Sequence, residues 1–181
     1  MIFTETALHG SYTIELEPFT DERGWFVRYF CKDEFMQIGH TKEWLQMNHS
    51  TTNRKGSLRG MHYQLPPFSE IKLVRCITGA VFDVIIDLRK NSSTFLQWVG
   101  FEISAKNRRM VYIPEGFAHG FQCLTDDCEL LYHHSEYYRP NVEAGIKYDD
   151  PRVNIEWPLP ITTISQRDTA HPYLDNNFKG I

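Results

Sequence analysis

The chain breaks into short segments of strand character separated by turn residues, and hardly any part of it carries a helical pattern. Residues 11–19 are the clearest case, because Tyr12, Ile14 and Leu16 alternate with polar residues at a period of two. Further strands are predicted over residues 25–30, 44–48, 71–77, 80–88, 98–104, 110–113, 120–124 and 129–137. Many short strands at roughly regular spacing predict an all-β sandwich or jelly roll.

One domain accommodates the whole chain. Its 181 residues fit the usual size of a single domain, and no internal repeat or linker-like run divides residues 1–181. The aromatic content of 14% is high and suits a β-rich fold or a pocket that stacks flat ligands. Only residues 32–38 look like a helical turn or two, with Asp33 as the expected N-cap.

Charge and composition exclude several functional classes. The net charge of −4 argues against a general nucleic-acid binder or a membrane-surface protein, since both are usually basic. No apolar run approaches the ~20 residues of a transmembrane helix. The first residues, MIFTETALHG, lack the basic and apolar regions of a secretory signal. The four cysteines form no C-x-x-C pair, so we expect reduced thiols and a cytoplasmic protein.

The strand predicted over residues 80–88 carries two acidic residues on one of its faces. Val81, Asp83, Ile85 and Asp87 alternate with a fully apolar set. If the Asp83 face lines the interior of the fold, this carboxylate is expensive to bury unless it is paired or useful. Periodicity alone leaves a solvent-facing side open as the alternative.

Three stretches are too polar for their strand-like surroundings. In the first, Gln46, Asn48, Arg59, His62 and Gln64 are spaced so that all five can project onto one face. The second embeds a lysine at position 72 among apolar residues, and the third holds a histidine at position 119 between small and aromatic residues.

Histidines on β-strands first suggest a metal site. His62, Gln64, Glu70 and His119 follow the order of a cupin metal site, but glutamine stands where the second histidine of the pair belongs. Three good ligands are the usual minimum for a catalytic metal. We therefore expect no metal.

The chain as a whole resembles the dTDP-4-dehydrorhamnose 3,5-epimerase family. The resemblance rests on DERGWF (21–26), QMNHS (46–50), LRGMHYQLPP (58–67), KLVRCITGAVFDVIIDLR (72–89), IPEGFAHGF (113–121), YDDP (148–151), EWP (156–158) and ISQRD (164–168). These motifs cover about residues 10–170 in the family's order. The resemblance implies a cupin-type jelly roll, a homodimer and no cofactor or metal requirement.

The resemblance also implies a reaction and residues for it. The substrate is a nucleotide-linked 4-keto-6-deoxyhexose, whose C3 and C5 protons are acidified by the ketone, so epimerisation needs a base, an enolate stabiliser and an acid. By resemblance His62 is the base and Asp168 orients and stabilises its imidazole. Lys72 lies near the C4 oxygen, and Tyr132 returns a proton at C5 from the opposite face.

The same resemblance implies a set of binding residues. Arg23, Arg59 and His119 contact the diphosphate or the sugar, which need cations and donors. The remaining substrate-binding residues are Gln46, Asn48, Tyr138, Glu143 and Arg167. Four other histidines lack such support and are assigned to the surface or to packing: His49, His133, His134 and His171.

Two positions depart from the family pattern. Position 28, close to the nucleotide base, is normally glutamate, but here it is Arg28. A carboxylate there accepts a hydrogen bond from N3–H of thymine or uracil, whereas arginine only donates, which suits cytosine. Arg28 can also turn to phosphate or solvent. The second departure is Glu70, which stands where a small or amide residue is more usual.

Two alternative functions stay open at this stage. One keeps the fold and the sugar but performs a C5-only or C3-only epimerisation, or a keto isomerisation, on a related, CDP-linked deoxysugar. The other is a non-catalytic sugar-nucleotide binder. Tyr132 favours chemistry at C5, and the pairing of His62 with Asp168 speaks against plain binding. Each of these residues, considered alone, could also have a purely structural role, such as a histidine of the core or a lysine of a strand. The pathway that the product feeds stays open.

Overall fold

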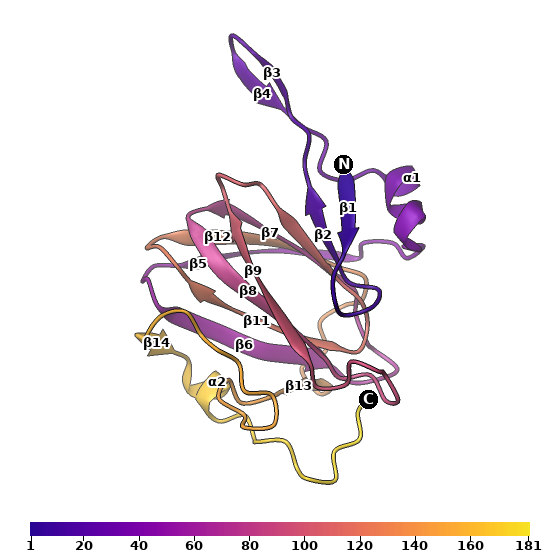
Figure 1. Ribbon diagram of the computed structural model, residues 1–181, viewed down its shortest axis with the longest axis vertical. Coiled ribbons are helices and arrows are strands. Elements are labelled where there is room, and N and C mark those ends of the chain that lie inside the picture. Colours follow the sequence, from indigo (N-terminus) through magenta and orange to yellow (C-terminus); the bar gives the residue numbers. More distant parts are fainter.

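Two sheets face each other in the computed structural model, which describes residues 1–181 (Figure 1). The first has the order β1 (Ile2–Glu5), β2 (Tyr12–Glu15), β10 (Met110–Ile113), β7 (Lys72–Thr78), β12 (Cys128–His134) and β5 (Gln46–Thr52). The second has the order β13 (Glu143–Gly145), β6 (Ser57–Gln64), β11 (Phe117–Cys123), β8 (Ala80–Asp87) and β9 (Trp98–Ser104), with β14 (Thr163–Ile164) beside β6. Only β14 pairs in parallel. The predicted all-β, cupin-type jelly roll is confirmed.

A small hairpin and three short helices complete the chain. The hairpin of β3 (Phe19–Asp21) and β4 (Gly24–Phe26) projects away from the two sheets (Figure 1). The helical turns are α1 (Lys32–Phe35), η1 (Met36–Ile38) and α2 (Gln166–Thr169). None of them is long and apolar enough to cross a membrane.

Two sequence expectations about these elements are wrong. The residue that caps α1 is Cys31, without a side-chain hydrogen bond, and Asp33 lies within the first turn. Residues 11–19 form no single strand, because β2 ends at Glu15 and β3 begins at Phe19. Pro18, which has no N–H to donate to a ladder, lies in the interruption.

Apolar side chains fill the space between the sheets and cover their outer faces. Val81 and Ile85 belong to the core between the sheets, whereas Val84 and Ile86 belong to a second cluster on the other face of β8. Trp157, from the C-terminal segment, packs on this second cluster. Both faces of β8 are therefore buried, and the solvent-facing alternative for its acidic side is wrong.

Candidate active site

A pocket of about 610 Å³, here called the inner pocket, opens between the two sheets. Strands β5, β7 and β12 of the first sheet and β6 and β11 of the second contribute polar side chains to it. The pocket brings together most of the predicted site residues: Gln46, Asn48, Arg59, His62, Lys72, His119, Tyr132, Tyr138, Glu143 and Arg167. A volume of this size is typical of a small-molecule site.

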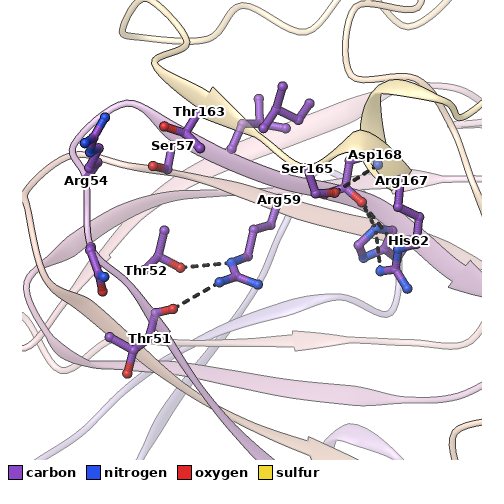
Figure 2. A pocket seen from close by; sticks show the side chains of 13 residues that line it. Thr51, Thr52, Arg54, Ser57, Arg59, His62, Thr163, Ser165, Arg167 and Asp168 are labelled. Carbon is purple, nitrogen blue, oxygen red and sulfur yellow. Dashed lines mark hydrogen bonds and ion pairs between the residues drawn. The ribbon is translucent and has the colours of Figure 1, made fainter.

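A second hollow, here called the outer groove, adjoins the inner pocket and shares Arg59, His62 and Arg167 with it. Figure 2 shows Asp168 meeting His62 at one end of this groove, beneath the C-terminal segment. Arg59 reaches across the groove, where its Nε donates to Thr52 Oγ1 at 2.9 Å and its Nη2 to the carbonyl of Thr51 at 3.0 Å.

A bulge in β6 places Arg59 and His62 on the same side of the sheet. These residues are three positions apart, so a regular strand sends them to opposite faces, and the alternation from which one shared face was predicted does not by itself produce it. Opposite them on β11, Phe121 pairs with Arg59 and His119 with His62, so β6 carries one extra residue. Gly60 allows this close approach, because a Cβ there would lie 2.5 Å from Gly120 Cα and its φ is +125°.

His62, which lines both hollows, forms a hydrogen-bonded pair with Asp168, which lines the outer groove. His62 Nε2 lies 2.8 Å from Asp168 Oδ1, and the other carboxylate oxygen accepts the Gly60 N–H at 3.2 Å. The Asp168 side chain is only 3% exposed, against 22% for His62. If Nε2–H of a neutral imidazole donates to Asp168, the lone pair is on Nδ1, which is then free to accept a proton.

The environment keeps Asp168 ionised. Burial acts to raise its pKa, but hydrogen bonds from His62 and from the Gly60 N–H outweigh this effect and lower the pKa below its usual value. Ser165 caps the short α2 by accepting the N–H of Asp168 at 3.0 Å, which fixes the backbone that carries the carboxylate. The Arg167 guanidinium lies 3.2 Å from His62 Nε2.

Tyr132 faces the inner pocket from β12, on the sheet opposite His62. Its hydroxyl hydrogen-bonds with Ser50 Oγ at 3.0 Å. Burial raises the pKa of the phenol well above its usual value, so the group stays protonated at neutral pH. A protonated phenol in a buried site can donate a proton.

Lys72 contacts two ionisable residues, Glu70 and His134, to which the sequence analysis gave no role in the site. Its Nζ is 3.1 Å from Glu70 Oε1, and Glu70 Oε2 accepts from His134 Nδ1 at 2.7 Å. Burial acts to raise the pKa of Glu70, but His134 and Lys72 outweigh it, and the pKa is lowered. Glu70, the second departure from the family pattern, therefore anchors the Lys72 ammonium at the pocket wall.

His134 lines this pocket, so its assignment to the surface or to packing is wrong. It also lies 3.3 Å from Asn48 Nδ2 and stacks near Tyr132. The missed signal was the period of two, since positions 132 and 134 of one strand face the same way. The same period from Gln46 and Asn48 reaches Ser50, a pocket residue that the sequence analysis also missed.

His119 is held from behind by the inward carboxylate of β8. Its Nε2 lies 2.7 Å from Asp83 Oδ1, and the Asp83 side chain is fully buried. Pairing with His119 accounts for the buried carboxylate that the strand pattern of residues 80–88 singled out.

A chain of hydrogen-bonded polar groups lies at the mouth of the inner pocket. Tyr138 donates its hydroxyl to Glu143 Oε2 at 2.8 Å, and Arg167 Nη1 donates to the same oxygen at 3.0 Å. The backbone N–H of Tyr138 donates to Gln46 Oε1 at 3.1 Å. An aromatic ring flanked by donors and acceptors suits a flat polar ligand such as a nucleobase.

Three predicted residues lie elsewhere. Arg23 pairs with Asp21 on the projecting hairpin, and Arg28 lies 3.5 Å from Glu34, so this chain brings neither to its own inner pocket. Gln64 does not join the face shared by the other polar residues, because its amide donates to the carbonyls of Phe68 and Tyr137 and accepts an N–H from the loop after β12.

The histidine–glutamine order of a cupin metal site is not assembled as a ligand set. His62 pairs with Asp168 and His119 with Asp83. Glu70 pairs with His134 and Lys72. The cluster with metal-ligand spacing is a different one, formed by His62, Asp168 and His171. His171 was assigned to the surface or to packing. Its side chain is mostly buried and lies against His62 and Asp168.

Comparisons with known proteins agree with the motifs. The chain matches the family model described as dTDP-4-dehydrorhamnose 3,5-epimerase over residues 5–176. The dTDP-4-dehydrorhamnose 3,5-epimerase of Shigella flexneri is 47% identical over 176 residues, which cover 96% of this chain and 97% of that protein.

Two crystal structures have the same fold. That of the Bacillus anthracis epimerase with TDP and PPi bound gives a TM-score of 0.92 at 36% identity and covers 96% of this chain and 99% of the other. That of the Legionella pneumophila epimerase in complex with dTDP-4-keto-L-rhamnose gives 0.90 at 38% identity and covers 95% and 92%. These similarities span both sheets and every strand of the inner pocket. The chain therefore belongs to the dTDP-4-dehydrorhamnose 3,5-epimerase family of isomerases.

Proposed function

We propose that this protein epimerises C3 and C5 of a nucleoside-diphosphate 4-keto-6-deoxyhexose of the dTDP-4-dehydro-6-deoxyglucose type. The observation that carries the proposal is that His62 and Tyr132 enter one pocket from facing sheets, with Lys72 on the strand next to Tyr132. The dTDP-4-keto-L-rhamnose bound to the Legionella pneumophila epimerase supports this choice of sugar.

The first step is removal of a proton beside the ketone. The base is His62, whose Nδ1 carries the free lone pair when Nε2–H donates to Asp168 at 2.8 Å. As the imidazole takes the proton it becomes a cation, and the ionised Asp168 stabilises it. The C4 oxygen gains negative charge at the same time, and the Lys72 ammonium is the fixed cation that stabilises this enolate.

The second step returns a proton to the opposite face of the sugar. Tyr132 is the acid at C5, because its phenol is protonated and it lies on the wall opposite His62. The other residues of the inner pocket hold the nucleotide sugar: Arg59, His119 and Arg167 supply donors to the diphosphate or sugar, and Gln46, Asn48, Tyr138 and Glu143 surround the remainder.

Proton NMR in deuterated water tests the reaction directly. We expect the enzyme to introduce deuterium at both C3 and C5 of a dTDP-linked 4-keto-6-deoxyhexose and to yield the doubly inverted sugar. Label at a single carbon would instead identify a monoepimerase. Label at neither carbon, with the nucleotide sugar bound, would identify a non-catalytic binder and overturn the proposal.

Tyr132→Phe is expected to separate proton removal from inversion. The change deletes the phenol, which bonds to Ser50 at 3.0 Å, while keeping the ring that fills the pocket wall. Deuterium exchange should persist, whereas C5 inversion should slow by about 10²-fold or more, in line with the loss of a general acid. Tyr12→Phe, on β2 and outside the pocket, is the matched control. Unchanged product stereochemistry and rate in Tyr132→Phe would assign this tyrosine to the structure alone.

We also propose that the enzyme is a homodimer whose projecting hairpin docks on the partner. Three large apolar side chains of this hairpin are exposed: Phe19 at 85%, Trp25 at 51% and Phe26 at 76%. Such a cluster on a projecting element fits a protein interface. Exchange of hairpins would carry Arg23 and Arg28 to the partner's pocket. We propose a cytoplasmic location for this protein, which its free thiols favour.

Arg28 gives a prediction about the nucleobase. With arginine beside the base, CDP is expected to bind at least as well as dTDP, because cytosine offers N3 as an acceptor where thymine offers a donor. Two donors facing each other in a desolvated pocket cost roughly 1–3 kcal/mol, which is a preference of about 5- to 150-fold. To reach a base, Arg28 must leave Glu34, which lies 3.5 Å away in this structure.

Calorimetric titration with dTDP, UDP and CDP measures this preference. The matched variant is Arg28→Glu, which restores an acceptor and is expected to shift the ranking toward dTDP. A wild-type preference for dTDP that Arg28→Glu leaves unchanged would show that Arg28 does not read the base.

A further inference from the structure

His171 has no place in the mechanism above, yet its imidazole lies against the pair that performs proton removal. The ring centroids of His62 and His171 are 5.4 Å apart, with the rings edge to face. His171 Nε2 is 3.8 Å from Asp168 Oδ1, and it is buried without a hydrogen-bond partner. A buried nitrogen without a partner calls for an explanation.

The chain fixes this imidazole from two sides. The short α2 ends just before it, and the backbone N–H of His171 hydrogen-bonds with the Asp168 carbonyl at 3.4 Å, which brings the two side chains to one side of the turn. The ring also packs on the backbone of Gly145, where a Cβ would lie 2.3 Å from its Cε1. Any residue larger than glycine at position 145 would displace the ring.

Three atoms with metal-ligand chemistry converge at this point. One ligand atom from each of His62, Asp168 and His171 lies within 4.8 Å of the other two. Ligands bound to Zn²⁺ at 2.0–2.2 Å in a tetrahedron are about 3.3 Å apart. The separations from Asp168 Oδ1 to His62 Nε2, 2.8 Å, and to His171 Nε2, 3.8 Å, bracket this value, so modest side-chain shifts suffice.

We propose that His62, Asp168 and His171 form a Zn²⁺ site whose occupation switches the enzyme off. Two imidazoles and one carboxylate are a ligand set typical of zinc, whereas Mg²⁺ and Ca²⁺ prefer oxygen ligands. Arg167, whose guanidinium lies 3.2 Å from His62 Nε2 and 3.6 Å from Asp168 Oδ1, has to move aside for the ion, and its side chain is more than half exposed.

Inhibition follows from the tautomer that coordination requires. A neutral imidazole that binds zinc through Nε2 carries its proton on Nδ1. Proton removal from the sugar needs the reverse arrangement, with the proton on Nε2 and the lone pair on Nδ1. Zinc also takes the carboxylate oxygen of Asp168 that stabilises the imidazolium. This inhibitory role rests on His62 as the base proposed above, but zinc binding itself does not.

The test combines calorimetry and turnover on the full-length enzyme after treatment with EDTA. Wild type is expected to bind one Zn²⁺ per chain and to lose turnover as the site fills, with recovery on adding EDTA and no effect of Mg²⁺. His171→Ala should turn over at the wild-type rate without zinc and lose about a hundredfold or more in zinc affinity, because even outer-shell changes cost 10–100-fold. Circular dichroism checks its fold.

His49→Ala is the matched control, since this half-exposed imidazole pairs with Glu129 outside both hollows. It should bind zinc and respond to it as wild type does. Equal zinc affinity in wild type and His171→Ala would overturn the site. Zinc binding that depends on His171 but leaves turnover unaffected would overturn the inhibition and leave the site intact. If no sample shows epimerase activity, the proposed function is overturned, while calorimetry still tests whether the zinc site exists.

Discussion

Replacing His62 by alanine is expected to reduce deuterium exchange at both C3 and C5 to the background rate while leaving the fold intact. The proposed mechanism assigns both proton removals to the same imidazole, and general bases contribute about 10²–10⁴-fold to a rate. His62 is partly exposed, so its truncation removes little core packing. The measurement is the NMR exchange experiment on each carbon, with circular dichroism as the check on folding.

Two further variants test the same role, one at the partner of His62 and one as a control. Asp168→Asn keeps the size of the partner but removes the charge that stabilises the imidazolium, so it should slow exchange at both carbons together. His49→Ala removes a histidine outside both hollows and should behave as wild type. Exchange close to the wild-type rate in His62→Ala would remove His62 from the role of base.

Much of the fold was predictable because strand alternation is a local signal. The segments 98–104 and 110–113 were predicted with the same bounds that β9 and β10 have. β6 was not among the predicted strands, since Gly60 and the bulge beside it interrupt the period of two. That interruption is also what turns Arg59 and His62 to the same face, so the irregular strand is the one that builds the site.

The residues of the pocket were predictable from the order of motifs, whereas their partners were not. Glu70 and His134 are 64 positions apart in sequence, and only the pairing of β7 with β12 brings them together. The contact between Asp168 and His171 is more local. Ser165 three residues before Asp168 resembles a helix-capping pattern, and a helical turn there places positions 168 and 171 on one side.

Lys72→Met is the second change for which a large effect is expected. Methionine keeps the length of the side chain but removes the ammonium, which the proposed mechanism places beside the developing C4 enolate oxygen. Loss of one fixed donor to an oxyanion costs about 3–4 kcal/mol, so kcat/KM should fall by about 10²–10³-fold. The fall should appear in kcat, because the stabilised charge exists only in the transition state. Steady-state kinetics with product detection by NMR separates kcat from KM.

Glu70 makes the interpretation of this variant testable. Lys72→Met leaves a buried carboxylate with His134 as its remaining partner, which can destabilise the pocket wall by itself. The double variant Lys72→Met/Glu70→Gln removes that stranded charge and is expected to be as slow as Lys72→Met. Glu70→Gln alone keeps the ammonium and should retain most of the activity. Recovery of turnover in the double variant would attribute the loss to the stranded Glu70, and a loss confined to KM would assign Lys72 to ground-state substrate binding.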